Sequence, residues 1–156
     1  MGALYANDIA RRYEALCEFR RCFLLIKADI AYGGTSLSEV FQHAKEQTQG
    51  IYYRWFRYLE KETAECFQTR FEEIWKQSIE QNLDCEILKQ EDLQELYILG
   101  RNMGGVNREQ QITMLELYLS KLEYSIQILE AEKVQKQKLC HILGIATSIF
   151  IVVLLV

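Results

Sequence analysis

The sequence has no proline among its 156 residues. An average usage of about 5% would place several prolines in a chain of this length. Because the proline ring removes a backbone donor and clashes with the preceding helical turn, proline interrupts helices. Its absence therefore favours long, unbroken helices.

The sequence also has few histidines and no closely spaced pair of cysteines. The two histidines are His43 and His141, and His43 stands three residues before Glu46 without a third metal ligand or a nucleophile. The five cysteines form no C-x-x-C pair, and we expect buried thiols in a reducing cytosol; they are Cys17, Cys22, Cys66, Cys85 and Cys140. The sequence therefore predicts no catalytic residue, metal, cofactor or small-molecule substrate, and the protein is not expected to be an enzyme.

An overall basic charge is missing as well. The net charge is -4, so composition gives no indication of nucleic-acid binding. The segment IYYRWFRY alternates Arg54 and Arg57 with aromatic rings, as single-strand binders do. On a helix, however, Trp55 and Leu59 face inward and both arginines face outward. We therefore expect no nucleic-acid partner.

One long apolar run is present, LCHILGIATSIFIVVLLV, over residues 139–156. As a helix its 18 residues span about 27 Å, against a hydrocarbon core of about 30 Å. The run therefore predicts a transmembrane helix, with a buried core helix as the alternative. Lys133, Lys136 and Lys138 precede it, which places residues 1–138 in the cytosol. The start, MGALYANDIARRYEA, is too short and polar for a signal peptide.

Apolar residues at spacings of three and four predict an all-α fold, a compact bundle of about six helices. The last helix continues into the transmembrane helix, so that residues from Asn107 to Val156 form one rod of about 75 Å. The buried face of the first helix is predicted from Ile9, Leu16, Phe19, Phe23, Ile26 and Ile30, and Phe67 is expected on the inner face of the fourth. The expected helices cover residues 7–32, 37–44, 51–67, 67–82, 88–103 and 107–156.

The sixth expected helix carries the most regular apolar pattern. Six residues alternate spacings of three and four over about three heptads: Ile112, Leu115, Leu119, Leu122, Ile126 and Leu129. We expect this seam over residues 112–129 to pack inside the domain. The alternative function is a tail-anchored tether or adaptor that pairs through the seam with a partner helix.

Three glycines within six residues mark the stretch LGRNMGGVNREQQ: Gly100, Gly104 and Gly105. A phosphate-binding loop of the Walker type would need a lysine and a hydroxyl residue after the glycines, and neither is present. Gly104 or Gly105 instead ends a helix, and Asn107 with Gln110 caps the next one. The stretch is interpreted as a turn between two helices.

A second turn is predicted around Gly33 and Gly34, which end the first helix. Ser36 with Glu39 forms an S-x-x-E capping box that begins the second helix.

Two stretches resemble a known family, that of stage III sporulation protein AB. IKADIAYGGTSLSEVF resembles its element E-I-x-Y-G-x-T-P-L-x-E-A through Asp29, Ile30, Tyr32, Gly33, Thr35, Leu37 and Glu39. LGRNMGGVNREQQ resembles its element L-G-x-x-L-G-x-S-D-x-x-x-Q through Leu99, Gly100, Gly104, Arg108 and Gln111. Trp75 also stands where the family tends to carry a tryptophan.

The N-terminus departs from this family. Its members usually have a first membrane span, whereas this sequence begins MGALYAND. Either a span precedes the sequence as given, or the chain is anchored only by its tail.

The resemblance implies a non-enzymatic platform in the channel between mother cell and forespore during endospore formation. Residues 1–138 would form a cytosolic domain resembling the F components of type II secretion systems, and residues 139–156 would lie in the mother-cell membrane. Expected partners are membrane lipid and other stage III sporulation channel proteins, including the cytosolic AA ATPase. The candidate contact residues are Tyr32, Gly33, Gly34, Thr35, Gly100, Gly104, Gly105, Asn107 and Arg108.

Overall fold

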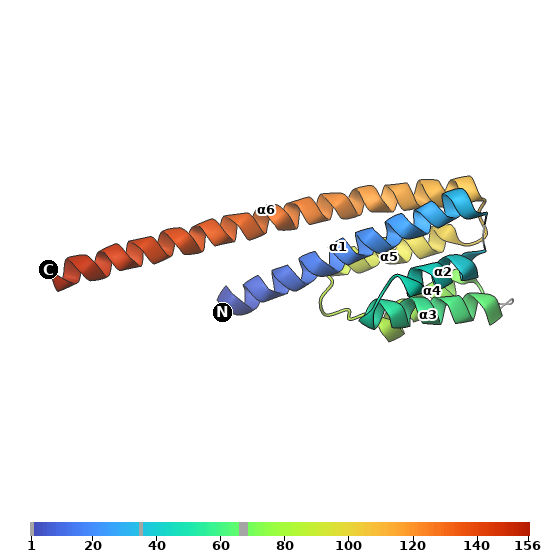
Figure 1. Cartoon of the computed structure of the whole chain (residues 1–156), viewed down its shortest axis with the longest axis horizontal. Coiled ribbons are helices and arrows are strands. Elements are labelled where there is room, and N and C mark those ends of the chain that lie inside the picture. Colours follow the sequence, from blue (N-terminus) through green and yellow to red (C-terminus); the bar gives the residue numbers. More distant parts are fainter. Residues whose placement is uncertain (1, 35, 66–68) are drawn as a thin grey trace.

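The computed structural model describes residues 2–34, 36–65 and 69–156, which form six α-helices and no strand (Figure 1). The all-α class and the number of helices are those that the sequence predicts. The helices are α1 (Gly2–Gly33), α2 (Leu37–Glu46), α3 (Gly50–Glu65), α4 (Phe71–Asn82), α5 (Gln90–Met103) and α6 (Arg108–Leu155).

Most helix boundaries lie close to the predicted ones, and two capping boxes account for two of the helix starts. Ser36 Oγ accepts a hydrogen bond from the Glu39 backbone N–H, and the Glu39 carboxylate accepts one from the Ser36 N–H. Asn107 and Gln110 exchange the same two bonds at the start of α6. Both boxes satisfy backbone donors that have no partner inside the helix.

Two boundaries differ from the prediction. Helix α1 begins at Gly2, about five residues early, because no residue in the first turns breaks it. Helix α4 begins at Phe71, where Arg70 has an extended backbone. The expectations for Cys66 and Phe67 lie outside the described residues.

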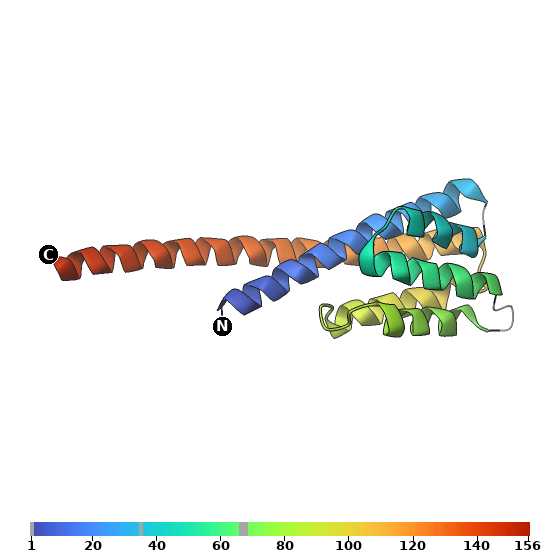
Figure 2. The ribbon, with the colours of Figure 1, turned by 60° about the horizontal axis from the view of Figure 1, so that its bottom comes forward.

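Among the described helices, each packs against the next along the chain, and α1 also packs against α6. The six helices therefore close into a ring around one core. Helices α1 and α6 run antiparallel along one side, with the remaining helices against them (Figures 1 and 2).

The core is rich in aromatic rings. Trp55 and Trp75 lie at its centre with ring centroids 5.5 Å apart, and Phe23 contacts both. The six apolar residues predicted for the inner face of α1 are all buried. Phe56 and Tyr118 are buried as well, although the spacing of apolar residues in the sequence does not place either of them on an inner helix face. Arg54 and Arg57 are exposed, as predicted.

The seam of α6 faces into the bundle. Four of its six residues are buried and the other two are half-buried. Since α6 packs on α1 and α5 through this side, the seam is already occupied within the chain. This arrangement does not favour the tether, which needs the seam free for a partner.

Helix α6 has 48 residues, which corresponds to about 72 Å. Its apolar end projects beyond the bundle (Figure 1), and every side chain in residues 139–156 is exposed. An 18-residue window of this helix has a mean hydropathy of 2.2 and no buried residue, so by length and composition the helix could cross a membrane. The alternative of a buried core helix is wrong, because no residue of this run is buried.

The expectation of buried cysteines is only partly correct. Cys22 is buried in α1 and Cys17 is half-buried, but Cys85 and Cys140 are exposed. Cys85 lies between α4 and α5, and Cys140 lies on the part of α6 that leaves the bundle.

Candidate interaction sites

The two glycine-containing turns proposed as contact regions lie at the same end of the molecule. The α1–α2 and α5–α6 connections both stand opposite the projecting end of α6 (Figures 1 and 2). Residues 32–34, residue 36 and residues 100–108 are therefore gathered at the far end of the bundle.

Tyr32 is the most exposed large side chain of the α1–α2 turn, with 91% of its surface accessible. Gly33 ends α1, and Gly34 has a φ of 59°, a conformation that glycine adopts without strain. Thr35 lies outside the described residues. One turn earlier, Asp29 Oδ2 lies 3.1 Å from Nδ1 of His43 and links α1 to α2.

The α5–α6 turn is closed by polar side chains. Gly105 has a φ of 71°, so one of the two adjacent glycines does adopt a left-handed conformation. The Gln111 side-chain amide donates to the Met103 carbonyl at 3.2 Å, which satisfies an acceptor at the C-terminus of α5. Asn107 and Arg108 are exposed, and no ion pair of Arg108 occurs among the described residues.

Gly100 and Gly104 face helix α4. A Cβ on Gly100 would lie 2.0 Å from Cδ1 of Trp75, and one on Gly104 would lie 3.0 Å from Cβ of Phe71. The Trp75 indole N–H donates to the Leu96 carbonyl at 2.9 Å, so the ring lies directly across α5. Gly100 is thus buried inside α5, and the exposed candidates on this turn are Gly105, Asn107 and Arg108.

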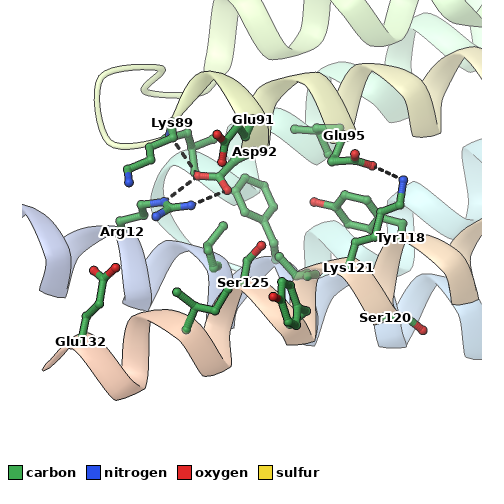
Figure 3. Close-up of a pocket in the computed structure, with 17 residues that line it drawn as sticks. Arg12, Lys89, Glu91, Asp92, Glu95, Tyr118, Ser120, Lys121, Ser125 and Glu132 are labelled. Atoms are coloured by element: carbon green, nitrogen blue, oxygen red, sulfur yellow. Dashed lines mark hydrogen bonds and ion pairs between the residues drawn. The ribbon is translucent and has the colours of Figure 1, made fainter. Parts of the chain in front are cut away.

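A groove of about 610 Å³ lies between α1, α5 and α6, away from both turns (Figure 3). The guanidinium of Arg12 donates to both carboxylate oxygens of Asp92, at 2.7 and 2.8 Å. The same carboxylate accepts from the Lys89 backbone N–H at 2.9 Å. At the other end of the groove, Lys121 donates to Glu95 at 2.9 Å.

The Arg12–Asp92 pair is well enclosed, with 12% and 7% of the two side chains exposed. The hydrogen bond to Asp92 raises the pKa of the Arg12 guanidinium above its usual value, in spite of burial. Burial also raises the pKa of Tyr118, which lines the groove. The charged groups in this groove join α1 to α5 and α5 to α6, and the described lining has no nucleophile paired with a base.

Several of these contacts have no signal in a single sequence. Arg12 and Asp92 are 80 positions apart, and neither belongs to a recognisable motif. Gln111 was singled out by its position in the stretch LGRNMGGVNREQQ, but its hydrogen bond to Met103 could not be predicted because it depends on the path of the turn. Among the described residues, no group of three or more His, Cys, Asp or Glu could hold a metal ion.

Comparison with known proteins identifies the family. The family model described as "Stage III sporulation protein AB (spore_III_AB)" matches residues 1–156. A solved structure described as "Stage III sporulation protein AB (SpoIIIAB)" superposes with a TM-score of 0.69 at 22% sequence identity. The match covers 80% of this chain and 98% of that chain, and at this identity it shows the shared fold alone. A comparison with curated proteins gave no match.

Proposed function

Because the chain belongs to the stage III sporulation protein AB family, we propose that it is a non-enzymatic membrane platform of the sporulation channel. Its role is to bind other proteins of the channel between mother cell and forespore. The family is a sporulation family and not a known enzyme family.

The observation that carries this proposal is the exposed apolar end of α6. It contains twelve Leu, Ile, Val and Phe residues, which contribute about -4 to -7 kcal/mol to membrane insertion. All of them are exposed in the chain alone. A bilayer would remove this surface from water, so residues 139–156 act as the transmembrane helix and residues 1–138 as the domain that it holds at the membrane.

The orientation of the domain follows from the charges beside this helix. Lys133, Lys136 and Lys138 precede the apolar run, and lysine is enriched on the cytoplasmic side of membrane helices. We therefore place the domain in the mother-cell cytosol, with the mother-cell membrane facing the forespore.

The far end of the bundle is the surface that we assign to a cytosolic partner. It lies away from the membrane and carries the exposed residues Tyr32, Asn107 and Arg108. Exposed tyrosine and arginine are the residue types most often found at the energetic centre of interfaces. By family resemblance the partner is the AA ATPase of the same channel.

A co-purification experiment tests this assignment. The full chain and the AA ATPase are produced together and recovered from detergent-solubilised membranes through a tag on the chain. The double variant Tyr32→Ala/Arg108→Glu should retain less ATPase, by tenfold or more if both residues belong to the interface centre. The matched control, Tyr124→Ala/Arg57→Glu, changes an exposed tyrosine and an exposed arginine away from this end.

The assignment of the far end fails if the control weakens ATPase recovery as much as the test variant, or if neither variant does. Circular dichroism should show equal helix content in both variants. The broader role as a platform fails if a strain that lacks the protein completes engulfed-forespore development normally.

A further inference from the structure

A second groove lies at the membrane end of the bundle, where the first turns of α1 run beside α6. Its volume is about 470 Å³, and its lining includes Ala6 and Ile9 of α1 and Lys133, Lys136, Gln137 and His141 of α6. The groove therefore reaches the point where the apolar run begins at Leu139. Its lining combines apolar side chains with two lysines.

The charged side chains that line this groove, Lys133 and Lys136, are both positive. From residue 133 to residue 156 the chain has three lysines and no Asp or Glu, and residues 2–7 have no Asp or Glu either. The nearest carboxylates along the two helices are Asp8, Glu130 and Glu132. Within the part of the chain that the structure describes, none of Lys133, Lys136 and Lys138 forms an ion pair.

Two of these lysines lie against aromatic rings of α1. Nζ of Lys136 is 3.2 Å from the ring centroid of Tyr5, and Nζ of Lys133 is 5.3 Å from that of Tyr13. The Lys136 ammonium is shielded from solvent and has no hydrogen-bond partner among the described residues. An ammonium has three N–H donors, and a ring face supplies no oxygen acceptor for them. Leaving such donors unpaired is unfavourable.

We propose that this groove binds the phosphate of an anionic phospholipid headgroup, such as phosphatidylglycerol. The phosphate oxygens would accept hydrogen bonds from the ammonium groups of Lys136 and Lys133, after a small rotation of the flexible lysine side chains. The lipid tails would lie along the apolar run that begins at Leu139. Tyr5 fits the same boundary, because tyrosine is enriched at the membrane–water interface.

This inference rests on the proposal that residues 139–156 span the membrane, because that places the groove at headgroup depth. A soluble phosphate offers the same oxygens, but the groove adjoins the point where lipid phosphates are concentrated. The lipid is therefore the source to which we assign the site.

The test uses the full chain reconstituted in phosphatidylcholine vesicles that contain a trace of spin-labelled lipid. Electron paramagnetic resonance measures the fraction of label that is immobilised at the protein surface, for phosphatidylglycerol and for phosphatidylcholine. We expect the protein to prefer phosphatidylglycerol. A lysine beside an anionic surface contributes a factor of about five to affinity, so Lys133→Gln/Lys136→Gln, which removes two lysines, should lower this preference by up to about 25-fold or remove it.

Two matched variants act as controls. Lys61→Gln/Lys76→Gln removes the same charge from exposed lysines on α3 and α4 and should keep the preference. Lys133→Arg/Lys136→Arg keeps both positive charges and should also keep it. Because none of these lysines belongs to the buried core, the helix content of the variants should equal that of the natural sequence.

Each remaining outcome overturns the lipid site. Equal immobilisation of both lipids shows no headgroup preference, and an equal loss in the Lys61/Lys76 control shows only a general charge effect. Displacement of labelled phosphatidylglycerol by inorganic phosphate, but not by sodium chloride at equal ionic strength, assigns the groove to a soluble anion. Release of the chain from vesicles by alkaline carbonate contradicts the membrane span itself, whereas a retained chain without preference contradicts only this inference.

Discussion

At the scale of single residues, the contact between Trp75 and Gly100 holds α4 and α5 together. The indole ring occupies the space that a side chain at position 100 would fill, and its N–H bonds to the backbone of α5. Glycine is needed here because another element approaches its backbone closely. The glycine that suggested a phosphate loop in the sequence has a packing role in the fold.

Replacement of Gly100 by alanine is therefore expected to destabilise the domain. In an open helix this change would stabilise by about 1 kcal/mol, but here the added Cβ collides with the indole, and overpacking costs about 1–3 kcal/mol. Chemical denaturation gives the change in the free energy of unfolding. Gly2→Ala is the control, because a Cβ there meets nothing within 4 Å. A gain of about 1 kcal/mol for Gly100→Ala, as in an open helix, would contradict the contact.

Cys22 gives the fold a dependence on alkaline pH. Burial raises the pKa of its thiol to about 12, from an ordinary value of 9.0. Above pH 9 the unfolded chain releases this proton while the folded chain keeps it, so stability falls as pH rises. The expected slope from this thiol is about 1.4 kcal/mol per pH unit.

The slope can be measured by denaturation under reducing conditions at pH 7, 9 and 10. For each protein, the free energy of unfolding is compared with its own value at pH 7. Between pH 9 and 10 this free energy should fall less in Cys22→Ala than in the natural sequence. Burial also raises the pKa of Cys85, Tyr52 and Tyr118. These three groups are present in both proteins, so the difference between the two pH profiles isolates Cys22. Parallel losses in the two proteins would contradict the role of Cys22.

At the scale of helices, capping residues were predictable and contacts between helices were not. Ser36 and Asn107 accept hydrogen bonds from backbone N–H groups three residues away, so a few consecutive residues are enough to predict these caps. Trp75 and Gly100 meet only because α4 and α5 pack as a hairpin. The face of α1 was predictable because six apolar residues repeat at helical spacing, while Phe56 and Tyr118 became buried through the closing of the ring.

The pair of Arg12 and Asp92 is expected to couple α1 to the start of α5. Removing one partner of an enclosed pair leaves the other charge unpaired, which costs about 3–5 kcal/mol. Arg12→Met and Asp92→Asn should each destabilise, and the double variant should lose less than the sum of both. A double-mutant cycle by denaturation measures this coupling.

The exposed pair of Lys27 and Glu116, which joins α1 to α6 at 3.0 Å, is the matched control. Its coupling should be below about 1 kcal/mol, since solvent screens it. Additive losses at Arg12 and Asp92 would show that the two side chains stabilise the bundle independently.

At the scale of the whole molecule, the core residues that the structure describes as buried all lie between Ile9 and Leu129. The apolar end of α6 contributes nothing to that core. A chain that ends at Lys138 should therefore fold as a compact, detergent-free monomer with the same thermal midpoint as the full chain in detergent micelles. Sedimentation velocity and circular dichroism measure these two properties, and a strongly self-associating rod would instead support the tether.

The closure of the ring by α1 and α6 also fixes when the protein can fold during synthesis. Arg20 and Glu123, which join these helices, are 103 positions apart. At about 5–20 residues per second, a ribosome needs roughly 5–20 s to make the intervening chain. Throughout that interval the apolar face of α1 has no α6 to cover it. The bundle therefore cannot close until the first part of α6 has been synthesised.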